Sequence, residues 1–390
     1  MLQINTNIGY NSVGRIAEQI GLEAMKDGWR SVIAYGRDID PDFKSQSETI
    51  KIGNKLDGVI HGLETRLFDR HGLGSTRATQ KFIKEIDELS PDVIHLHNIH
   101  GYYLNYQILF EYLAQRGTPV VWTFHDMWPI TGHCAFPDPA GCVKWQTQCH
   151  DCPLRKEYPA SMFKDNSYAN YLAKRKAFTS LKNLNIVTVS DYYKDIVNKS
   201  FLSSYSVTSI RNGVEILPIK KEKTAPYILG VASNWEPRKG LNQFIELREL
   251  LPKNIDIILI GLNDKQISML PTGMTGIKRL SDKSELYQYY ANAIAYVNLS
   301  MGETLSLTNL EAQACGIPTV TYASGGTIET VSAKTGIALP AGDILTLASY
   351  IKKIINRELL FTPDACRAFI ANNFNAVNAY RPYIEMYDRL

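Results

Sequence analysis

Short apolar runs alternate with amphipathic stretches along the first third of the chain. Four runs predict buried strands: residues 2–5, 31–35, 91–97 and 119–125. Between the first two runs, apolar residues recur at helical spacing over residues 12–26. Strands that alternate with helices in this way predict parallel pairing with right-handed crossovers, as in a doubly wound α/β domain.

The same pattern restarts beyond a charged stretch between Pro218 and Pro226, which we interpret as a linker. Further strands are expected at residues 227–232, 255–262, 295–299 and 318–322, and further helices at residues 241–251, 285–293 and 306–315. A last helix is expected at residues 380–390. We therefore predict a first domain over residues 1–217, a second over 218–375, and a C-terminal helix within 376–390 that packs back on the first domain.

Composition agrees with a protein of two domains. A chain of 390 residues exceeds one ordinary core. Its formal net charge of +3 gives no basic face of the kind that binds nucleic acid, so no nucleic-acid partner is expected. The start resembles no signal peptide and no apolar run approaches ~18 residues, which predicts a cytoplasmic location. The sequence does not indicate an oligomeric state.

Candidate ligand-binding residues lie where the predicted strands end, at the edge where doubly wound sheets bind ligands. Glu303 follows one such strand, and Glu311 lies about two turns further on, so two carboxylates could hold sugar or ribose hydroxyls. Backbone N–H groups of the intervening helix start would face an anion. These groups belong to Leu305, Ser306, Leu307 and Thr308. The alternative is an acidic helix start followed by a solvated Glu.

Basic residues and glycines mark two candidate phosphate loops. Arg238 and Lys239 precede Gly240 after the first strand of the second series, which suits a diphosphate, or is a helix entry with exposed basic residues. The pair Gly325-Gly326 is a second candidate loop, or a simple turn.

In the first series, Gly14 follows the first strand and could admit a ligand closely. His125 ends a buried strand, where it is either a polar anchor or base near a reacting hydroxyl, or a structural histidine.

Four of the six cysteines lie within an insertion at residues 132–155, namely Cys134, Cys142, Cys149 and Cys152. The C-x2-C pair, completed by the other two, predicts a structural zinc site in which His133 or His150 could replace a cysteine. Disulfides and free thiols are the alternatives. Four protein ligands would leave no open position, so we predict no catalytic role for this metal.

Together these segments resemble the retaining glycosyltransferases of family 4, which have the GT-B fold of two facing Rossmann-like domains with an inter-domain cleft. Glu303 and Glu311 look like the family's E-x7-E element, Lys239-Gly240 like its diphosphate-binding Lys-Gly, and Gly325-Gly326 like its Gly-Gly loop. The sequence segments around Gly14, His125 and Lys239 are similar to those of bacterial enzymes of exopolysaccharide, colanic-acid-like or O-antigen assembly. Two positions depart from the pattern, because Asn234 replaces the usual arginine and Ser306 a frequent glycine.

The resemblance implies a nucleotide-diphosphate sugar donor of the UDP or GDP type and a glycan or lipid-linked acceptor, with no catalytic metal. Glu311 would hold the donor ribose and Glu303 the sugar hydroxyls. Lys239 and Arg238 would offset charge on the departing diphosphate, and His125 would contact the sugar near the anomeric centre.

Three other expectations remain open. The basic, aromatic stretch at residues 168–182 could touch an anionic membrane surface at the inner face of the plasma membrane, or be a solvated helix face. A sugar-nucleotide epimerase or hydrolase of the same fold is one alternative function. A non-catalytic scaffold that binds zinc and a nucleotide is the other.

Overall fold

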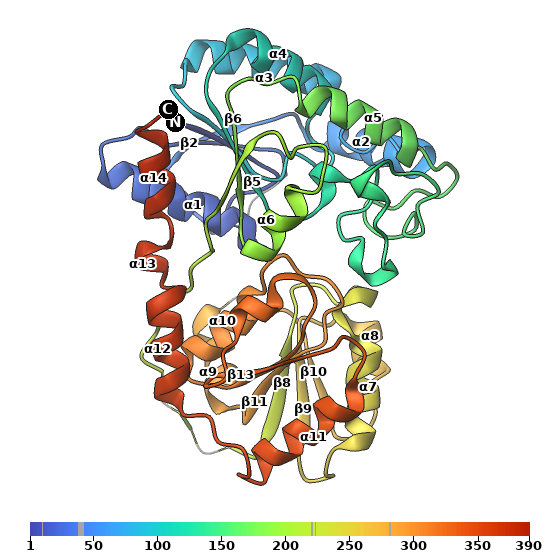
Figure 1. Ribbon diagram of the computed structural model, residues 1–390, viewed down its shortest axis with the longest axis vertical. Coiled ribbons are helices and arrows are strands. Elements are labelled where there is room, and N and C mark those ends of the chain that lie inside the picture. The colour runs from blue at the N-terminus through green and yellow to red at the C-terminus, as the bar shows by residue number, and fades with distance from the viewer. Residues whose placement is uncertain (10, 38–42, 220, 223, 281) are drawn as a thin grey trace. The chain divides into compact units, whose positions relative to one another are not determined.

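The computed structural model describes residues 1–9, 11–37, 43–219, 221–222, 224–280 and 282–390. The chain forms two compact units, each built around one parallel sheet. The first unit comprises residues 1–210 and 380–390, and the second comprises residues 211–379 (Figure 1).

The first unit has a seven-stranded parallel sheet in the order β3-β2-β1-β4-β5-β6-β7. Its strands are β1 (Leu2–Asn5), β2 (Val32–Tyr35), β3 (Glu48–Lys51), β4 (Ile94–Leu96), β5 (Val120–Phe124), β6 (Leu184–Thr188) and β7 (Ser206–Ser209). Its helices are α1 (Asn11–Lys26), α2 (Lys55–Phe68), α3 (Thr76–Leu89), α4 (Tyr106–Arg116), α5 (Ser167–Phe178), α6 (Asp191–Val197) and α14 (Arg381–Tyr387). The four strands expected from the apolar runs are confirmed, as is the first helix. The strand order reverses between β1 and β4, which is the doubly wound topology.

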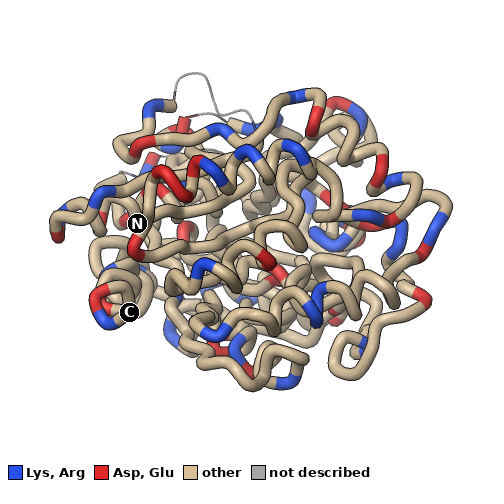
Figure 2. The backbone as a smooth tube through the Cα atoms, turned by 90° about the horizontal axis from the view of Figure 1, so that it is seen from above, with Lys and Arg blue, Asp and Glu red and all other residues tan. Residues whose placement is uncertain are grey.

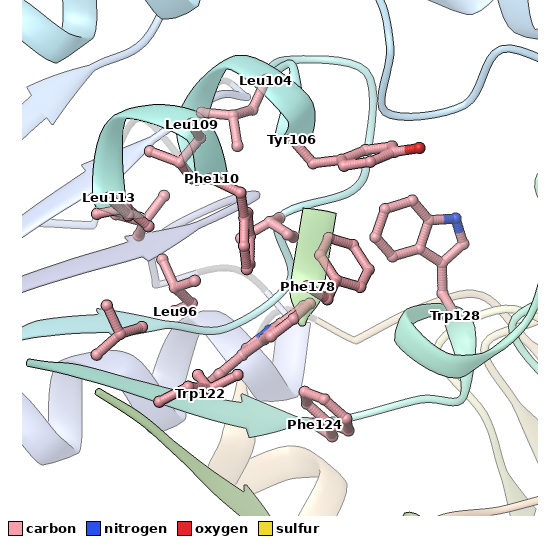
Figure 3. Close-up of a cluster of buried hydrophobic side chains, with 14 of the residues drawn as sticks. Leu96, Leu104, Tyr106, Leu109, Phe110, Leu113, Trp122, Phe124, Trp128 and Phe178 are labelled. Carbon is pink, nitrogen blue, oxygen red and sulfur yellow. The ribbon is translucent and has the colours of Figure 1, made fainter. Parts of the chain in front are cut away.

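Aromatic residues from α4, β5 and α5 form the centre of the first core (Figure 3). The ring of Phe178 lies 4.7 Å from that of Phe110 and 4.8 Å from that of Trp122, measured between centroids. All three side chains are fully buried. This packing fixes β5 and therefore the position of His125, which directly follows the strand.

The C-terminal helix α14 packs in the first unit against α1. The Tyr387 hydroxyl lies 2.6 Å from His95 Nδ1, and Thr123 donates to the Tyr383 hydroxyl over 3.2 Å. The return begins later than residue 376, because α13 (Ala376–Ala379) belongs to the second unit. There the Ala376 N–H donates to the carbonyl of Val214.

The second unit has a six-stranded parallel sheet in the order β10-β9-β8-β11-β12-β13. Its strands are β8 (Tyr227–Val231), β9 (Asp256–Ile260), β10 (Met274–Ile277), β11 (Ala295–Asn298), β12 (Thr319–Tyr322) and β13 (Gly336–Leu339). Its helices, besides α13, are α7 (Leu241–Leu250), α8 (Asp264–Ser268), α9 (Lys283–Asn292), α10 (Leu307–Ala314), α11 (Ile344–Ile355) and α12 (Pro363–Asn373). The predicted second series is confirmed, and the fold class is that of two Rossmann-like α/β domains.

The predicted linker includes residues 220 and 223, which lie outside the described residues. Its described part lies on the second unit. Leu217 and Ile219 pack against a buried cluster of that unit, and the Glu222 N–H donates to Asn292 Oδ1 over 2.7 Å. These contacts explain why the second unit begins before residue 218.

Charge and hydropathy give two further observations. Lys and Arg are interspersed with Asp and Glu along the chain (Figure 2), in line with the small net charge. Within the described ranges, none of the helices has the length and apolar character needed to cross a bilayer.

Candidate active site

In the second unit, the loop after β8 meets the loop after β11. The first loop contains a short 3-10 turn, η4 (Pro237–Lys239), and ends at Gly240 with φ +80°. A Cβ on Gly240 would lie only 2.6 Å from the carbonyl oxygen of Leu299, so glycine permits this close approach. The Met301 N–H donates to the carbonyl of Arg238 over 2.8 Å and joins the two loops.

This junction brings together three of the predicted catalytic side chains. Lys239 Nζ donates to Glu303 Oε1. Arg238 Nη1 donates to the carbonyl of Gly302 over 2.8 Å and lies 3.8 Å from Glu303 Oε1. Two cations thus share one carboxylate at the carboxyl end of the sheet.

Burial and neighbouring charge shift the pKa values of Glu303 and Lys239 in opposite directions. Burial alone would raise the pKa of Glu303, but the charges of Lys239 and Arg238 outweigh it and hold that pKa below its usual range. Burial lowers the pKa of Lys239, and Glu303 opposes this shift. Glu303 is therefore ionised at neutral pH, with positive charge beside it.

The predicted Gly-Gly loop lies against the backbone of Glu303. It begins the 3-10 segment η5 (Gly325–Thr330), and the Gly326 N–H donates to the Glu303 carbonyl over 2.9 Å. A Cβ on Gly325, whose φ is +65°, would lie 2.0 Å from that carbonyl oxygen. Only glycine fits at position 325 without a shift of the loop, and the role of this pair in binding phosphate stays a prediction.

Helix α10 carries the second predicted carboxylate. It begins at Leu307, so Leu305 and Ser306 precede the helix while Leu307 and Thr308 form its first turn. Glu311 accepts a hydrogen bond from the Tyr290 hydroxyl over 3.2 Å. The structure therefore places Glu311 beside α9 and Glu303 beside Lys239, on different sides of the helix start.

Buried amides hold this helix start, and they did not figure among the predicted residues. Asn298 Nδ2 donates to Ser306 Oγ over 2.9 Å and to Asn309 Oδ1 over 2.8 Å. Asn309 Nδ2 in turn donates to Thr330 Oγ1 in η5 over 2.8 Å. An Asn inside an otherwise apolar predicted strand was the available signal, because a buried amide needs partners.

In the first unit, His125 is the end of a chain of buried polar groups that starts in β1. Gln3 Nε2 donates to the Ala17 carbonyl over 2.8 Å, which turns Gln3 Oε1 toward His97 Nε2 at 2.9 Å. His97 Nδ1 lies 3.1 Å from His125 Nε2. Burial lowers the pKa of His97 well below its usual range, so this ring is neutral.

The chain of contacts fixes which nitrogen of each ring carries hydrogen. A neutral His97 that donates to Gln3 Oε1 from Nε2 must accept at Nδ1. His125 therefore donates from Nε2 and keeps its lone pair on Nδ1. Burial, aided by the His100 charge and opposed by Asp126, lowers the pKa of His125 to about 4, so this tautomer holds at neutral pH.

Asp126, next to His125, is held rigidly. Its Oδ2 lies 2.9 Å from His100 Nε2, and its Oδ1 accepts the Trp128 N–H over 2.9 Å. Tyr193 donates to its backbone carbonyl. These contacts fix the segment directly after β5. We infer that the buried, hydrogen-bonded Asp126 holds the neighbouring His125 in position.

Gly14 lies inside α1, in contact with the loop after β1. A Cβ there would lie 2.7 Å from Asn7 Oδ1 and 3.1 Å from the backbone nitrogen of Gly9. The helix and the loop therefore approach closely at Gly14, and the approach of a ligand there stays a prediction. The neighbouring residue 10 and the side chain of residue 11 are outside the described part of the chain.

The insertion folds as irregular backbone with two 3-10 turns, η2 (Asp138–Ala140) and η3 (Lys144–Gln146). All four cysteines are free thiols. They line one small pocket together with His133 and His150. Cys134 and Cys152 share a hydrogen bond. Among the described residues, no set of three or more His, Cys, Asp or Glu side chains is arranged to hold a metal ion.

One histidine of this pocket has an unusual environment. His133 Nδ1 lies 2.6 Å from Asp69 Oδ1, and both side chains are fully buried. His133 Nε2 is buried with no hydrogen-bond partner among the described residues. A carboxylate behind one ring nitrogen and an unsatisfied second nitrogen is the arrangement that metal-ligating histidines adopt.

The predicted membrane-facing stretch over residues 168–182 is partly wrong. Lys174 is only 1% exposed, and its ammonium donates to the carbonyls of Trp128 and Thr131 over 2.7 and 2.9 Å. It also lies 3.5 Å from the centroid of the Trp128 ring. Lys174 is therefore buried, where its hydrogen bonds stabilise the segment after β5, and it cannot reach a surface.

Sequence comparison matches both units to known protein families. Residues 13–216, more than half of the chain, match the profile described as Glycosyltransferase Family 4, and residues 215–375 match that of Glycosyl transferases group 1. The chain belongs to this glycosyltransferase family. The predicted enzyme class is confirmed.

Named relatives agree with this assignment. The chain is 24% identical over 382 residues to the putative colanic acid biosynthesis glycosyl transferase WcaC of Escherichia coli, covering 93% of this chain and 92% of the relative. Sucrose-phosphate synthase from Thermosynechococcus elongatus has a similar structure, with TM-score 0.71, 17% identity and coverage of 100% and 98%. Anabaena Alr3699/HepE in complex with UDP-glucose gives TM-score 0.67, 16% identity and coverage of 100% and 99%. The glycosyltransferase is thus of the GT-B type and related to enzymes of polysaccharide biosynthesis.

Proposed function

We propose that this glycosyltransferase is a retaining enzyme of bacterial surface polysaccharide synthesis. It transfers a sugar from a nucleotide-diphosphate donor of the UDP or GDP type to a glycan or lipid-linked acceptor at the cytoplasmic side of the membrane. The observation that carries the proposal is the cluster of Glu303, Lys239 and Arg238 against the Gly325-Gly326 loop. The UDP-glucose complex of a structural neighbour and the colanic acid relative support it.

In this proposal the two cations act on the leaving group. Breaking the bond between sugar and diphosphate places negative charge on the phosphate oxygens, and Lys239 with Arg238 stabilises that charge. Backbone N–H groups at the start of α10 and at Gly325 add to this stabilisation, while the Gly326 N–H holds the loop against the Glu303 carbonyl. With this positive charge from the chain itself, the reaction requires no catalytic metal.

The carboxylates and His125 hold the donor. Glu303 accepts hydrogen bonds from sugar hydroxyls, and Glu311 accepts them from the ribose. His125 accepts a hydrogen bond at Nδ1 from a sugar hydroxyl near the anomeric centre, because Nδ1 is the nitrogen that carries its lone pair. Retention follows when the acceptor approaches on the face that the diphosphate leaves, with a donor phosphate oxygen taking the acceptor proton.

The donor is tested by calorimetric titration with UDP, GDP, ADP and CMP. We expect tight binding of UDP or GDP, at least tenfold weaker binding in Glu311→Ala, and little change in the control Glu358→Ala, which lies elsewhere in the second unit. Nuclear magnetic resonance of the product then gives the anomeric configuration. Inversion would contradict the proposed mechanism, and conversion of donor to an epimer or free sugar at enzymatic rates without acceptor would favour the alternative activity.

We also propose that the cysteine pocket binds one structural zinc ion through thiolates of Cys134, Cys142, Cys149 and Cys152, with His133 able to replace one of them. The supporting observation is the unsatisfied His133 Nε2 among the thiols. Purified protein should contain about one zinc per chain, and Cys149→Ser should lower both the zinc content and the melting temperature. Full-length protein with no bound metal and four titratable thiols would refute this proposal without affecting the transferase.

A further inference from the structure

Helix α2 of the first unit is amphipathic, but its apolar face is exposed and its buried residues are polar. Its apolar side chains recur at helical spacing on one face and are all exposed, between 37% and 65%: Leu56, Val59, Ile60, Leu63 and Leu67. The buried residues of the helix are the polar His61 and Thr65. Among the described residues, the hydrophobic core cluster of the first unit includes no side chain of α2.

Polar contacts attach α2 to its unit. His61 Nε2 accepts the N–H groups of Gly72 and Gly74 over 3.0 and 3.3 Å, and His61 Nδ1 lies 2.9 Å from Ser75 Oγ. Burial lowers the pKa of His61 to about 4, so the ring is neutral and accepts at Nε2. The attachment is therefore specific, and it fixes the apolar face outward.

A neighbouring loop extends the apolar face. The Met162 N–H donates to the Arg66 carbonyl over 2.7 Å, and Asn166 Nδ2 donates to the Phe68 carbonyl over 2.6 Å. Met162 and Phe163 are 62% and 67% exposed, and Phe68 is 45% exposed. We call the face of α2, with Phe68, Met162 and Phe163, the α2 patch.

The segments that form the α2 patch carry exposed basic side chains. Over residues 55–70 and 154–165, five basic residues are exposed, namely Lys55, Arg66, Arg70, Lys156 and Lys164, against two exposed acidic residues, Glu157 and Asp165. The carboxylate of Asp165 accepts the N–H groups of Cys152 and Ser167 over 2.6 and 2.9 Å and keeps its charge. With five exposed cations against two exposed carboxylates, the exposed side chains of these segments carry net positive charge.

We propose that the α2 patch docks the enzyme on an anionic lipid bilayer. A helix that presents aliphatic side chains outward with Lys and Arg beside them binds the headgroup region, where the apolar face enters the acyl boundary and the cations meet anionic lipids. A helix face with exposed Leu, Ile and Met side chains suits a fluid surface better than a fixed protein pocket. This inference deepens the proposed function, since it rests on the lipid-linked acceptor and names the surface that reaches it.

The test is sedimentation of the full-length protein with vesicles of phosphatidylcholine containing about 30% phosphatidylglycerol. The wild type should sediment with these vesicles, more weakly with pure phosphatidylcholine, and less at high salt. Ile60→Glu/Leu63→Glu should lower vesicle binding at least tenfold. The matched control is Leu345→Glu/Leu360→Glu, which charges two exposed leucines of the second unit and should leave binding unchanged.

Folding and activity readouts separate the possible results. Both double variants should keep the wild-type melting temperature, because the substituted side chains are exposed. Wild type that stays in solution with anionic vesicles would overturn the proposal, as would equal binding by Ile60→Glu/Leu63→Glu. A wild-type dimer that this variant converts to a monomer, without lipid binding, would assign the patch to a second copy of the chain instead. Nucleotide titration of the same proteins tests the transferase site independently, so failure of one claim does not imply failure of the other.

Discussion

At the scale of single residues, the hydrogen bonds from Gln3 through His97 to His125 should determine which nitrogen of His125 carries hydrogen, and therefore affect kcat. Gln3→Ala removes the acceptor that orients His97, so His125 can adopt the wrong tautomer. We expect kcat to fall about tenfold or more, while nucleotide affinity, measured by calorimetry, stays the same because Glu311 and the loops proposed to bind the diphosphate lie in the second unit.

Loss of a buried hydrogen bond that does not reach His125 should lower stability and leave kcat unchanged. Ser31→Ala removes a comparably buried hydrogen bond, 2.9 Å between Ser31 and Ser47, without touching His125. It should cost about 1 kcal/mol of stability and leave kcat unchanged. Equal effects of the two substitutions on kcat would refute the positioning role of Gln3.

The Glu303–Lys239 pair makes stability depend on pH. In the wild type the pKa of Glu303 is depressed, so its stabilising contribution is present above its usual pKa and is lost as pH falls through the depressed value. Lys239→Met leaves the carboxylate without its main partner and should destabilise the second unit by about 1–3 kcal/mol at pH 7.

Acid should reduce this defect, because a protonated Glu303 needs no cation. The difference in unfolding free energy between wild type and Lys239→Met, measured from pH 7 to 4, should therefore shrink as pH falls. The double variant Lys239→Met/Glu303→Gln, which has no carboxylate to leave unpaired, should be more stable at pH 7 than the single variant. A defect independent of pH would contradict the ion pair.

At the scale of elements, the Gly-Gly loop must approach Glu303 closely. Gly325→Ala places a Cβ 2.0 Å from the Glu303 carbonyl oxygen at a φ of +65°, so the loop has to move away. We expect loss of stability of about 2 kcal/mol and at least a tenfold loss of activity.

The matched control is Gly342→Ala. This glycine also has a positive φ, +87°, but no atom lies within 4 Å of an added Cβ. It should cost about 1 kcal/mol through backbone strain alone and keep full activity in the same transferase assay. Normal activity of Gly325→Ala would show that the contact with Glu303 is not needed.

Helix α14 is the second element with a specific test. Tyr387→Phe leaves His95 Nδ1 without its partner at 2.6 Å in a buried site, which should lower stability by about 1–2 kcal/mol in chemical denaturation. Tyr168→Phe removes the hydroxyl of a half-exposed tyrosine on α5 and should have no effect. Equal stability of the two variants would mean that α14 is held by apolar packing alone.

At the scale of the whole molecule, the two units have separate hydrophobic cores. Trp122→Ala should lower the stability of the first unit by about 3–5 kcal/mol, and Leu259→Ala that of the second by about 2–5 kcal/mol. Hydrogen exchange followed by mass spectrometry should show faster exchange in residues 1–210 for the first variant and in 211–379 for the second. Acceleration in both units by either variant would contradict independent cores.

The sequence by itself determined the two α/β series and the order of their motifs, and the resemblance of those motifs to a known family indicated the enzyme class. Apolar runs of strand length separated by helical periodicity leave few alternatives to parallel sheets, and Glu303, Lys239 and Gly325 each lie in the segment that follows such a run. Local patterns suffice for the strands and helices because each depends on neighbours within a few turns of chain.

Only the tertiary structure decided which side chains meet and which face of an element is covered. The apolar face of α2 is exposed, although apolar side chains at helical spacing usually face a core. Lys174, part of a stretch expected to face a membrane or solvent, is buried. Gln3 in β1 and His97 directly after β4 orient His125, and Asp69 contacts His133 from 64 residues away. Burial and hydrogen-bond partners arise from contacts distant in sequence, and the spacing of residues along one segment carries no record of them.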